Sequence, residues 1–156
     1  MESNYDKYVM GQTMGKFGVI SVHLWLEHLL VLCVRTVVPN PEPLFRDRGI
    51  SFPLLVSLCE AHQVIDAPLA DILRKVNALR NKCAHQLTFN PREPDYQAIH
   101  IATEQLVPAG AQSEGEGPLR LLAELVEQKA IEIGAIQADT TQQSLPAASP
   151  NSRRHG

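Results

Sequence analysis

Three side chains within the stretch ALRNKCAHQL, residues 78–87, have types and spacings that suit work on a phosphate and a proton. Arg80 carries a guanidinium, which binds anions through paired hydrogen bonds. His85 carries an imidazole, a group whose reference pKa of about 6.5 lets it gain or lose a proton near neutral pH. Asn81 lies four residues before His85, so on a helix its amide can orient the ring. The segment is therefore a candidate polar site.

The position of Arg80 on its predicted helix is unusual. It follows Leu69 by eleven positions, which places it only about 20° from Leu69 around a helix of 3.6 residues per turn. Arg80 then points into an apolar stripe, where an unpaired guanidinium is very unfavourable and cannot shed its charge. We expect compensation by a buried acid such as Glu27, by a second subunit, or by a bound anion.

A basic segment surrounds Arg80. The run RKVNALRNK, residues 74–82, has four positive charges and no negative one. A neighbouring side of the same helix holds donors and an imidazole but no acid, and its members are Arg74, Asn77, Asn81 and His85. This side is a candidate phosphate-facing patch. Arg80 and His85 do not share a face, because five residues separate two side chains by about 140°. They can cooperate if Arg80 reaches around, if the helix distorts, or if two copies meet in a symmetric dimer.

The elements that position these residues are predicted to be helices. No stretch shows sustained period-two alternation, so the fold class is all-α, a small bundle of about five helices. The first helix spans Lys16–Val37 and stops before PNPEP, and a loop, LFRDRGI, follows. The second begins after Ser51 as its N-cap and has a stripe of Leu54, Leu55, Leu58, Ala61 and Ile65.

The third predicted helix carries the candidate site. Asp66 is its N-cap, Pro68 lies in its first turn, and its stripe comprises Leu69, Ile72, Leu73, Val76, Leu79, Cys83 and Leu87. A fourth pattern ends before Pro108 and comprises Tyr96, Ile99, Thr103 and Leu106. A fifth lies within residues 118–136 and has Leu122, Leu125, Val126 and Ile133 on one face. We expect one helical domain over residues 1–136 and a disordered C-terminal tail over residues 137–156, which has few apolar groups.

Composition narrows the class of protein. The net charge of -3 gives no overall attraction to polyanions, so nucleic acid would have to be met by a local patch. The N-terminus lacks a secretory h-region, and we expect a cytoplasmic protein with three reduced, buried thiols, Cys33, Cys59 and Cys83. The apolar first helix contains ionisable groups that are costly in a bilayer, so we expect a buried helix and no membrane partner.

Cofactor and metal sites are not indicated. His23 and His28 would lie about 140° apart on a helix, which is unsuitable for a zinc pair. His23 and Glu27 have the spacing of a local polar pair, for which satisfaction within the core is the favoured interpretation. Glycine-rich nucleotide-binding motifs are absent from the sequence. We therefore expect neither cofactor nor metal.

The hexapeptide RNKCAH, residues 80–85, resembles the R-x4-6-H signature of the HEPN superfamily. It looks most like the branch with the signature lRNxxAH, which includes mannitol-repressor-like proteins. The upstream order also fits: a long apolar helix with an internal LEHLL, a linker, a helix, and then a capped helix that carries the motif. The resemblance covers roughly residues 17–87.

The resemblance implies an enzyme. In nuclease members, two motifs face each other across a homodimer and form one metal-independent endoribonuclease site. Carried over, Arg80 and His85 are the catalytic pair and Asn81 orients or contacts them, while the basic side provides RNA-binding candidates, namely Arg74, Lys75, Asn77 and Lys82. A toxin or defence role would add an antitoxin or regulatory protein as partner. Some nuclease branches have a tyrosine soon after the histidine, whereas here Phe89 is the nearest aromatic residue.

Other interpretations remain open. The same branch includes regulators, so a noncatalytic helical regulator or adaptor with the same dimer is the alternative function. A structural subunit that keeps the motif for folding is a third. His85 can simply interact with the helix C-terminal dipole, and Asn81 can serve as a local cap or face solvent.

Overall fold

The computed structural model describes residues 15–46, 48–108 and 119–137. Within them the chain forms six helices and no strand, which confirms the all-α fold class. The helices are α2 (Lys16–Val37), α3 (Glu42–Phe45), α4 (Phe52–Ala61), α5 (Ala67–His85), α6 (Glu93–Glu104) and α7 (Arg120–Glu132). The tail predicted to be disordered lies almost entirely outside the described residues.

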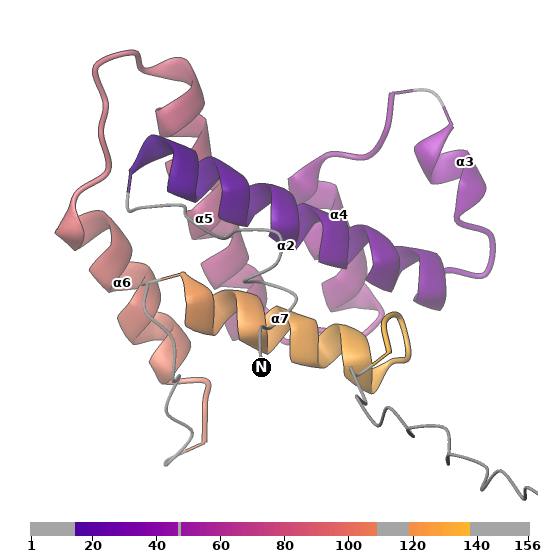
Figure 1. Ribbon diagram of the computed structural model, residues 1–156. Helices are drawn as coiled ribbons and strands as arrows, with labels where there is room; N and C mark the ends of the chain where they lie inside the picture. The colour runs from indigo at the N-terminus through magenta and orange to yellow at the C-terminus, as the bar shows by residue number, and fades with distance from the viewer. Residues whose placement is uncertain (1–14, 47, 109–118, 138–156) are drawn as a thin grey trace, which may run out of the picture.

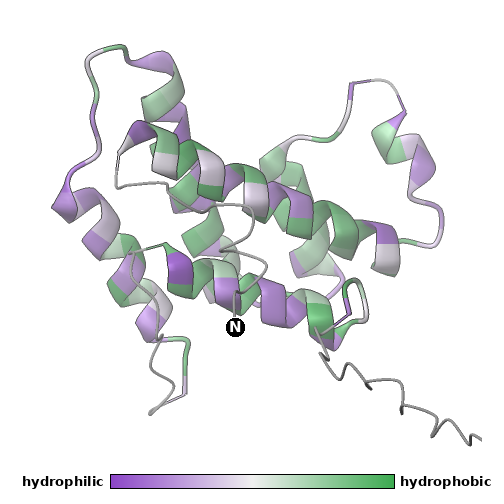
Figure 2. Ribbon diagram, viewed as in Figure 1, coloured by the Kyte–Doolittle hydropathy of each residue, from purple (hydrophilic) through white to green (hydrophobic). Residues whose placement is uncertain are grey.

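Helix α2 is central to the bundle and packs against α4, α5 and α7. Helix α5 also contacts α4 and α6, and α6 reaches α7, so that the five longer helices enclose one core (Figure 1). Figure 2 shows apolar and polar residues interleaved along each of these helices, as expected for amphipathic helices. The helices therefore bury one face each and leave the other available for contacts.

The predicted bounds of α2 are confirmed. The helix is long and apolar enough to cross a membrane by length and composition, and half of its most apolar window is buried inside the bundle. Nine of its residues are buried, and eight of them are apolar side chains. The ninth is His23, which is 4% exposed. The predicted absence of a membrane partner and the cytoplasmic location stay predictions.

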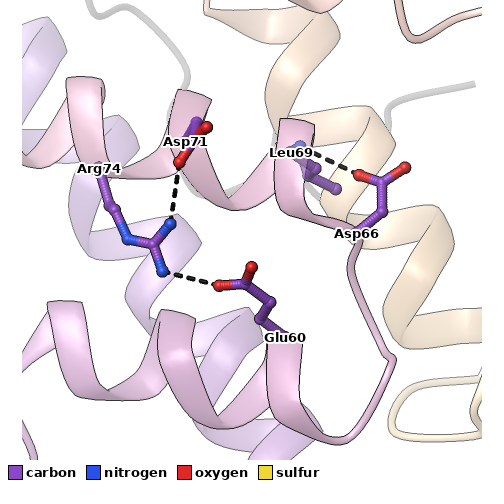
Figure 3. Close-up of polar contacts among 5 residues, drawn as sticks. All are labelled: Glu60, Asp66, Leu69, Asp71 and Arg74. Atoms are coloured by element: carbon purple, nitrogen blue, oxygen red, sulfur yellow. Dashed lines mark hydrogen bonds and ion pairs between the residues drawn. The ribbon is translucent and has the colours of Figure 1, made fainter.

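Helix α5 begins as the sequence predicts. The Asp66 side chain accepts a hydrogen bond of 3.0 Å from the Leu69 backbone N–H (Figure 3). The predicted stripe is buried from Leu69 to Cys83. Its last member, Leu87, was wrongly included, because the helix ends at His85 and Leu87 is 96% exposed. Just after the helix, the Lys16 ammonium donates hydrogen bonds to the carbonyls of Gln86 and Leu87.

Two other helices differ from their predicted form. Helix α4 ends at Ala61 and buries Phe52, Leu55, Val56 and Cys59. Of the predicted stripe, Leu55 and Ile65 are buried and Leu58 packs against the core, whereas Leu54 and Ala61 are exposed and were wrongly included. The chain turns there because Gln63 adopts a left-handed φ of 59° and the Val64 N–H bonds to the Cys59 carbonyl. Helix α7 ends at Glu132, short of the predicted end.

The predicted loop between α2 and α4 contains an additional short helix, α3. Pro41 is the N-cap of α3 and Pro43 lies in its first turn, where a missing N–H leaves no hydrogen bond unmade. The proline-rich segment after α2 therefore also favours the start of α3. Arg35 at the end of α2 pairs with Glu42, and its guanidinium lies 4.3 Å above the Phe45 ring. These contacts attach α3 to the end of α2, away from the motif end of α5 (Figure 1).

Three thiols are buried, as predicted. Cys33, Cys59 and Cys83 are free, and each is at most 5% exposed. Cys59 lies on α4 against α2 and directs its thiol at the Leu30 carbonyl, 3.9 Å away. These cysteines contribute to packing of the core.

Candidate functional site

Arg80 lies on the side of α5 that faces α2 and is half-buried. Its Nη1 donates a hydrogen bond of 3.2 Å to the Oδ1 of Asn81. Over the described residues, no carboxylate oxygen lies within 4.0 Å of its guanidinium, and Glu27 is not its ion-pair partner. The predicted compensation by Glu27 is therefore wrong, and no other acid of the described residues takes its place. The guanidinium is stabilised by a hydrogen bond to the neutral Asn81 amide and by its partial exposure to solvent.

His85 is the last residue of α5 and is exposed. The amide oxygen of Asn81 is used by Arg80, and no hydrogen bond from Asn81 to His85 is formed in the described structure. The Lys16 Nζ holds the chain just after His85 by donating to the carbonyls of Gln86, at 2.9 Å, and Leu87, at 2.8 Å. Lys16 therefore fixes the backbone that carries the imidazole, while the ring itself stays accessible.

Arg74 does not belong to an acid-free surface. Its guanidinium bridges Glu60 of α4, at 2.7 Å, and Asp71 of α5, at 3.0 Å (Figure 3). The hydrogen bond that Arg74 donates to the Glu60 carboxylate is the main reason that the pKa of Arg74 is raised. The prediction that this side lacks acids was wrong, because α4 and the preceding turn of α5 supply them. Arg74 links two helices, and any role in RNA binding stays a prediction.

The other three RNA-binding candidates differ in how far their side chains are exposed to solvent. Lys75 and Lys82 are exposed and form no ion pair with a described residue. Asn77 is half-buried and its Oδ1 lies 3.0 Å from the Nε2 of His23. The two lysines can reach a polyanion, whereas Asn77 faces into the bundle.

His23 is a residue that sequence reasoning placed in the core and not in the site. It joins three helices, because its ring lies on α2, bonds to Asn77 of α5 and packs 4.2 Å from the Phe52 ring of α4. Burial is the main cause that lowers the pKa of His23, and the charge of Arg80 lowers it further, against the opposing effects of Asn77 and Glu27. The sequence feature that could have identified His23 is its position as a single histidine within the apolar stripe of α2.

The geometry of one copy leaves the proposed catalytic pair apart. Arg80 and His85 are both on the regular helix α5, where five residues correspond to about 140° of rotation. Across residues 15–46, 48–108 and 119–137, no three His, Cys, Asp or Glu side chains group as a possible metal site. A cavity of about 340 Å³ lies beside the α4–α5 turn and Lys129, at the opposite end of α5 from His85.

Comparisons of the chain with protein-family models, with curated proteins and with solved structures found no match. The resemblance to the HEPN superfamily stays a prediction, which rests on the motif at residues 80–85 and on the order of helices around it.

Proposed function

We propose that this protein is a metal-independent endoribonuclease of the HEPN type that acts as a homodimer, in a toxin or defence role. The observation that carries the proposal is the state of Arg80. Its cation lies half-buried on the α2 side of α5 without a carboxylate partner among the described residues, beside an amide that holds it in place. Such a group is prepared to receive an anionic ligand, and an RNA phosphate is the ligand that the motif implies.

The proposed reaction uses the two ends of the motif differently. His85 accepts the proton of a ribose 2′-hydroxyl, whose oxygen attacks the adjacent phosphorus and expels the 5′-oxygen of the next nucleotide. The leaving oxygen takes a proton from water, and the His85 imidazolium returns its proton to the solvent, so that the products are a 2′,3′-cyclic phosphate and a free 5′-hydroxyl. Arg80 stabilises the charge that develops on the phosphate oxygens. Exposure of His85 is consistent with access by RNA.

A second copy completes the site in this proposal. Because the helix separates Arg80 from His85, a two-fold arrangement of two α5 helices brings one copy's Arg80 toward the other copy's His85. Phe17 at the start of α2 and Leu87 just after α5 are 79% and 96% exposed. The Lys16–Leu87 hydrogen bond places both near the motif end, where they offer apolar area for such contact.

The test is cleavage of a mixed single-stranded RNA in EDTA by wild-type protein and by Arg80→Ala and His85→Ala, with light scattering for each. We expect cleavage that leaves cyclic phosphate ends, and a loss of about 10²- to 10⁴-fold in His85→Ala. Loss of about 10²- to 10³-fold is expected for Arg80→Ala, as for other groups that stabilise transition-state charge. Arg46→Ala and His62→Ala are matched controls, because both residues are exposed and lie outside the motif. A folded wild-type dimer that leaves RNA intact contradicts the proposal.

A noncatalytic regulator or adaptor is the second candidate function. The observations that favour it are the neutralisation of Arg74 by Glu60 and Asp71, which weakens the basic path, and the exposed apolar Phe17 and Leu87. Phe17→Ser and Leu87→Ser then abolish dimer formation or partner binding, while Arg80→Ala leaves both unchanged. The enzyme predicts instead that Arg80→Ala abolishes RNA cleavage while the dimer stays intact.

A further inference from the structure

His23 and Asn77 form a polar pair inside an otherwise apolar junction. The His23 residue is 4% exposed, and its neighbours one turn away on α2, Val19 and Leu26, are fully buried. Its Nε2 lies 3.0 Å from Asn77 Oδ1 and its ring packs on Phe52, so α2, α4 and α5 meet at one imidazole. Polar pairs in an apolar core are costly, and their best-attested benefit is to define one arrangement of the elements that they join.

The hydrogen bond fixes the tautomer of His23. An amide oxygen only accepts, so the Nε2 must carry the proton and donate it to Asn77. The Nδ1 is then a bare nitrogen, and it is buried without a hydrogen-bond partner in the described structure. Protonation would place a second N–H in that enclosed position. The neutral ring with its single donor is the form that fits.

Asn77 connects this pair to the motif. It precedes Arg80 by three residues and Asn81 by four, which is one turn of α5. The charged groups that act on the His23 ring are Glu27 of α2, which raises its pKa, and Arg80 of α5, which lowers it. Phe52, the neighbour from α4, brings no charge. A rotation of α5 that broke the His23–Asn77 bond would also move Arg80.

We propose that His23 is a positioning residue of the proposed ribonuclease site, which fixes the rotation of α5 through Asn77 and so holds Arg80 and Asn81 at the α2–α5 surface. This role rests on the proposed function for its consequence in catalysis. The geometry on which it depends, a single donated hydrogen bond across two helices, is independent of whether RNA is cleaved.

The test begins with wild-type full-length protein labelled with ¹⁵N. Long-range ¹H–¹⁵N spectra of the histidine rings should show His23 as the Nε2–H tautomer, with a slowly exchanging proton, from pH 8 to pH 6. The ring protons of His28, which is exposed on the same helix, should exchange rapidly. A His23 ring proton that exchanges as rapidly as those of His28, or a His23 ring in the Nδ1–H tautomer, overturns the proposal, whatever any variant does.

The double variant His23→Phe/Asn77→Leu keeps similar volumes and removes both polar partners. We expect it to stay folded, because an apolar pair can replace a buried polar pair. The Arg80 Nε–H and Asn81 side-chain signals should move and broaden, whereas His28→Phe should leave them unchanged. Unchanged Arg80 and Asn81 signals in the folded double variant overturn the positioning role. If the double variant does not fold, the wild-type ring spectra decide.

Cleavage separates the two proposals. If the wild type cleaves RNA in EDTA, the double variant should show a fall of about tenfold or more in kcat, with KM changed less, because misplaced groups reduce the rate of the chemical step. Equal kcat in a folded double variant overturns the positioning role while leaving the ribonuclease intact. If the wild type does not cleave, the proposed function fails, and the ring and Arg80 signals still test His23.

Discussion

Asp66 is the residue whose local role is most directly testable. Its side chain accepts the Leu69 N–H at 3.0 Å, and it satisfies a donor that the first turn of α5 leaves free. Replacing Asp66 by Ala should lower the free energy of unfolding by about 1 kcal/mol, measured by urea denaturation. Asp71→Ala is the control, because this exposed carboxylate pairs with Arg74 at the surface and should cost at most about 0.5 kcal/mol. Equal losses would contradict a specific capping role.

The positions of the motif residues on their helix could be predicted from the sequence, but the residues with which they interact could not. Helical spacing correctly placed Asp66 at the start of α5, whereas Arg80, predicted to point into the apolar stripe, is only half-buried. The sequence wrongly suggested Glu27 as the ion-pair partner of Arg80 and predicted that no acid lies near Arg74. Those contacts depend on how α2 and α4 pack against α5. His23 escaped notice as a site residue since its partner, Asn77, is 54 positions away.

Two helices, α4 and α7, are each followed by a residue in the left-handed backbone conformation. Gln63 after α4 has a φ of 59°, and Gly134 after α7 has a φ of 74°. An L side chain in this region is strained, and glycine is not. Gln63→Gly should therefore raise the free energy of unfolding by about 1 kcal/mol, and Gly134→Ala should lower it by about 1 kcal/mol. No change in either variant would contradict the idea that these turns carry strain.

Lys16 stabilises the end of α5 from another helix. Its ammonium donates hydrogen bonds to the carbonyls of Gln86 and Leu87, the two residues that follow the last residue of α5. Lys16→Met should increase amide hydrogen exchange in the last turn of α5 by about fivefold, equivalent to about 1 kcal/mol of lost local stability. Lys75→Met removes the same charge from an exposed site on α5 and should leave that exchange unchanged. Equal effects would indicate a general electrostatic cause.

Helix existence was more predictable than helix bounds and faces. Apolar spacing identified all five longer helices, and α5 was correct because its stripe is regular and Asp66 caps it. In α4 nearly every residue is apolar, so spacing could not select the face, and the structure buries Phe52 and Val56 in place of Leu54 and Ala61. The short α3 could not be expected from periodicity, because four residues have none.

At the scale of the whole molecule, the bundle places His23, the one mostly buried imidazole among the described residues, where three helices meet. The core around it is apolar, and the remaining ion pairs described lie at half-exposed or exposed positions, where each contributes little. The relative arrangement of α2, α4 and α5 therefore depends on packing, with His23 and Asn77 as the directional contact between them. A change in the charge of that ring should affect the stability of the bundle as a unit.

The pH dependence of unfolding tests this coupling. Burial, aided by Arg80, lowers the pKa of His23 below its ordinary value of 6.5, against the opposing effects of Asn77 and Glu27. Below about pH 6.5 the unfolded chain thus binds a proton at this residue more readily than the folded one, and the stability that neutral His23 provides is lost as the pH falls. Urea denaturation at pH 7.5, 6.5 and 5.5 should show a smaller acid-induced loss for His23→Phe than for wild type. His28→Phe should match wild type, and identical losses in all three proteins would exclude His23 as the source.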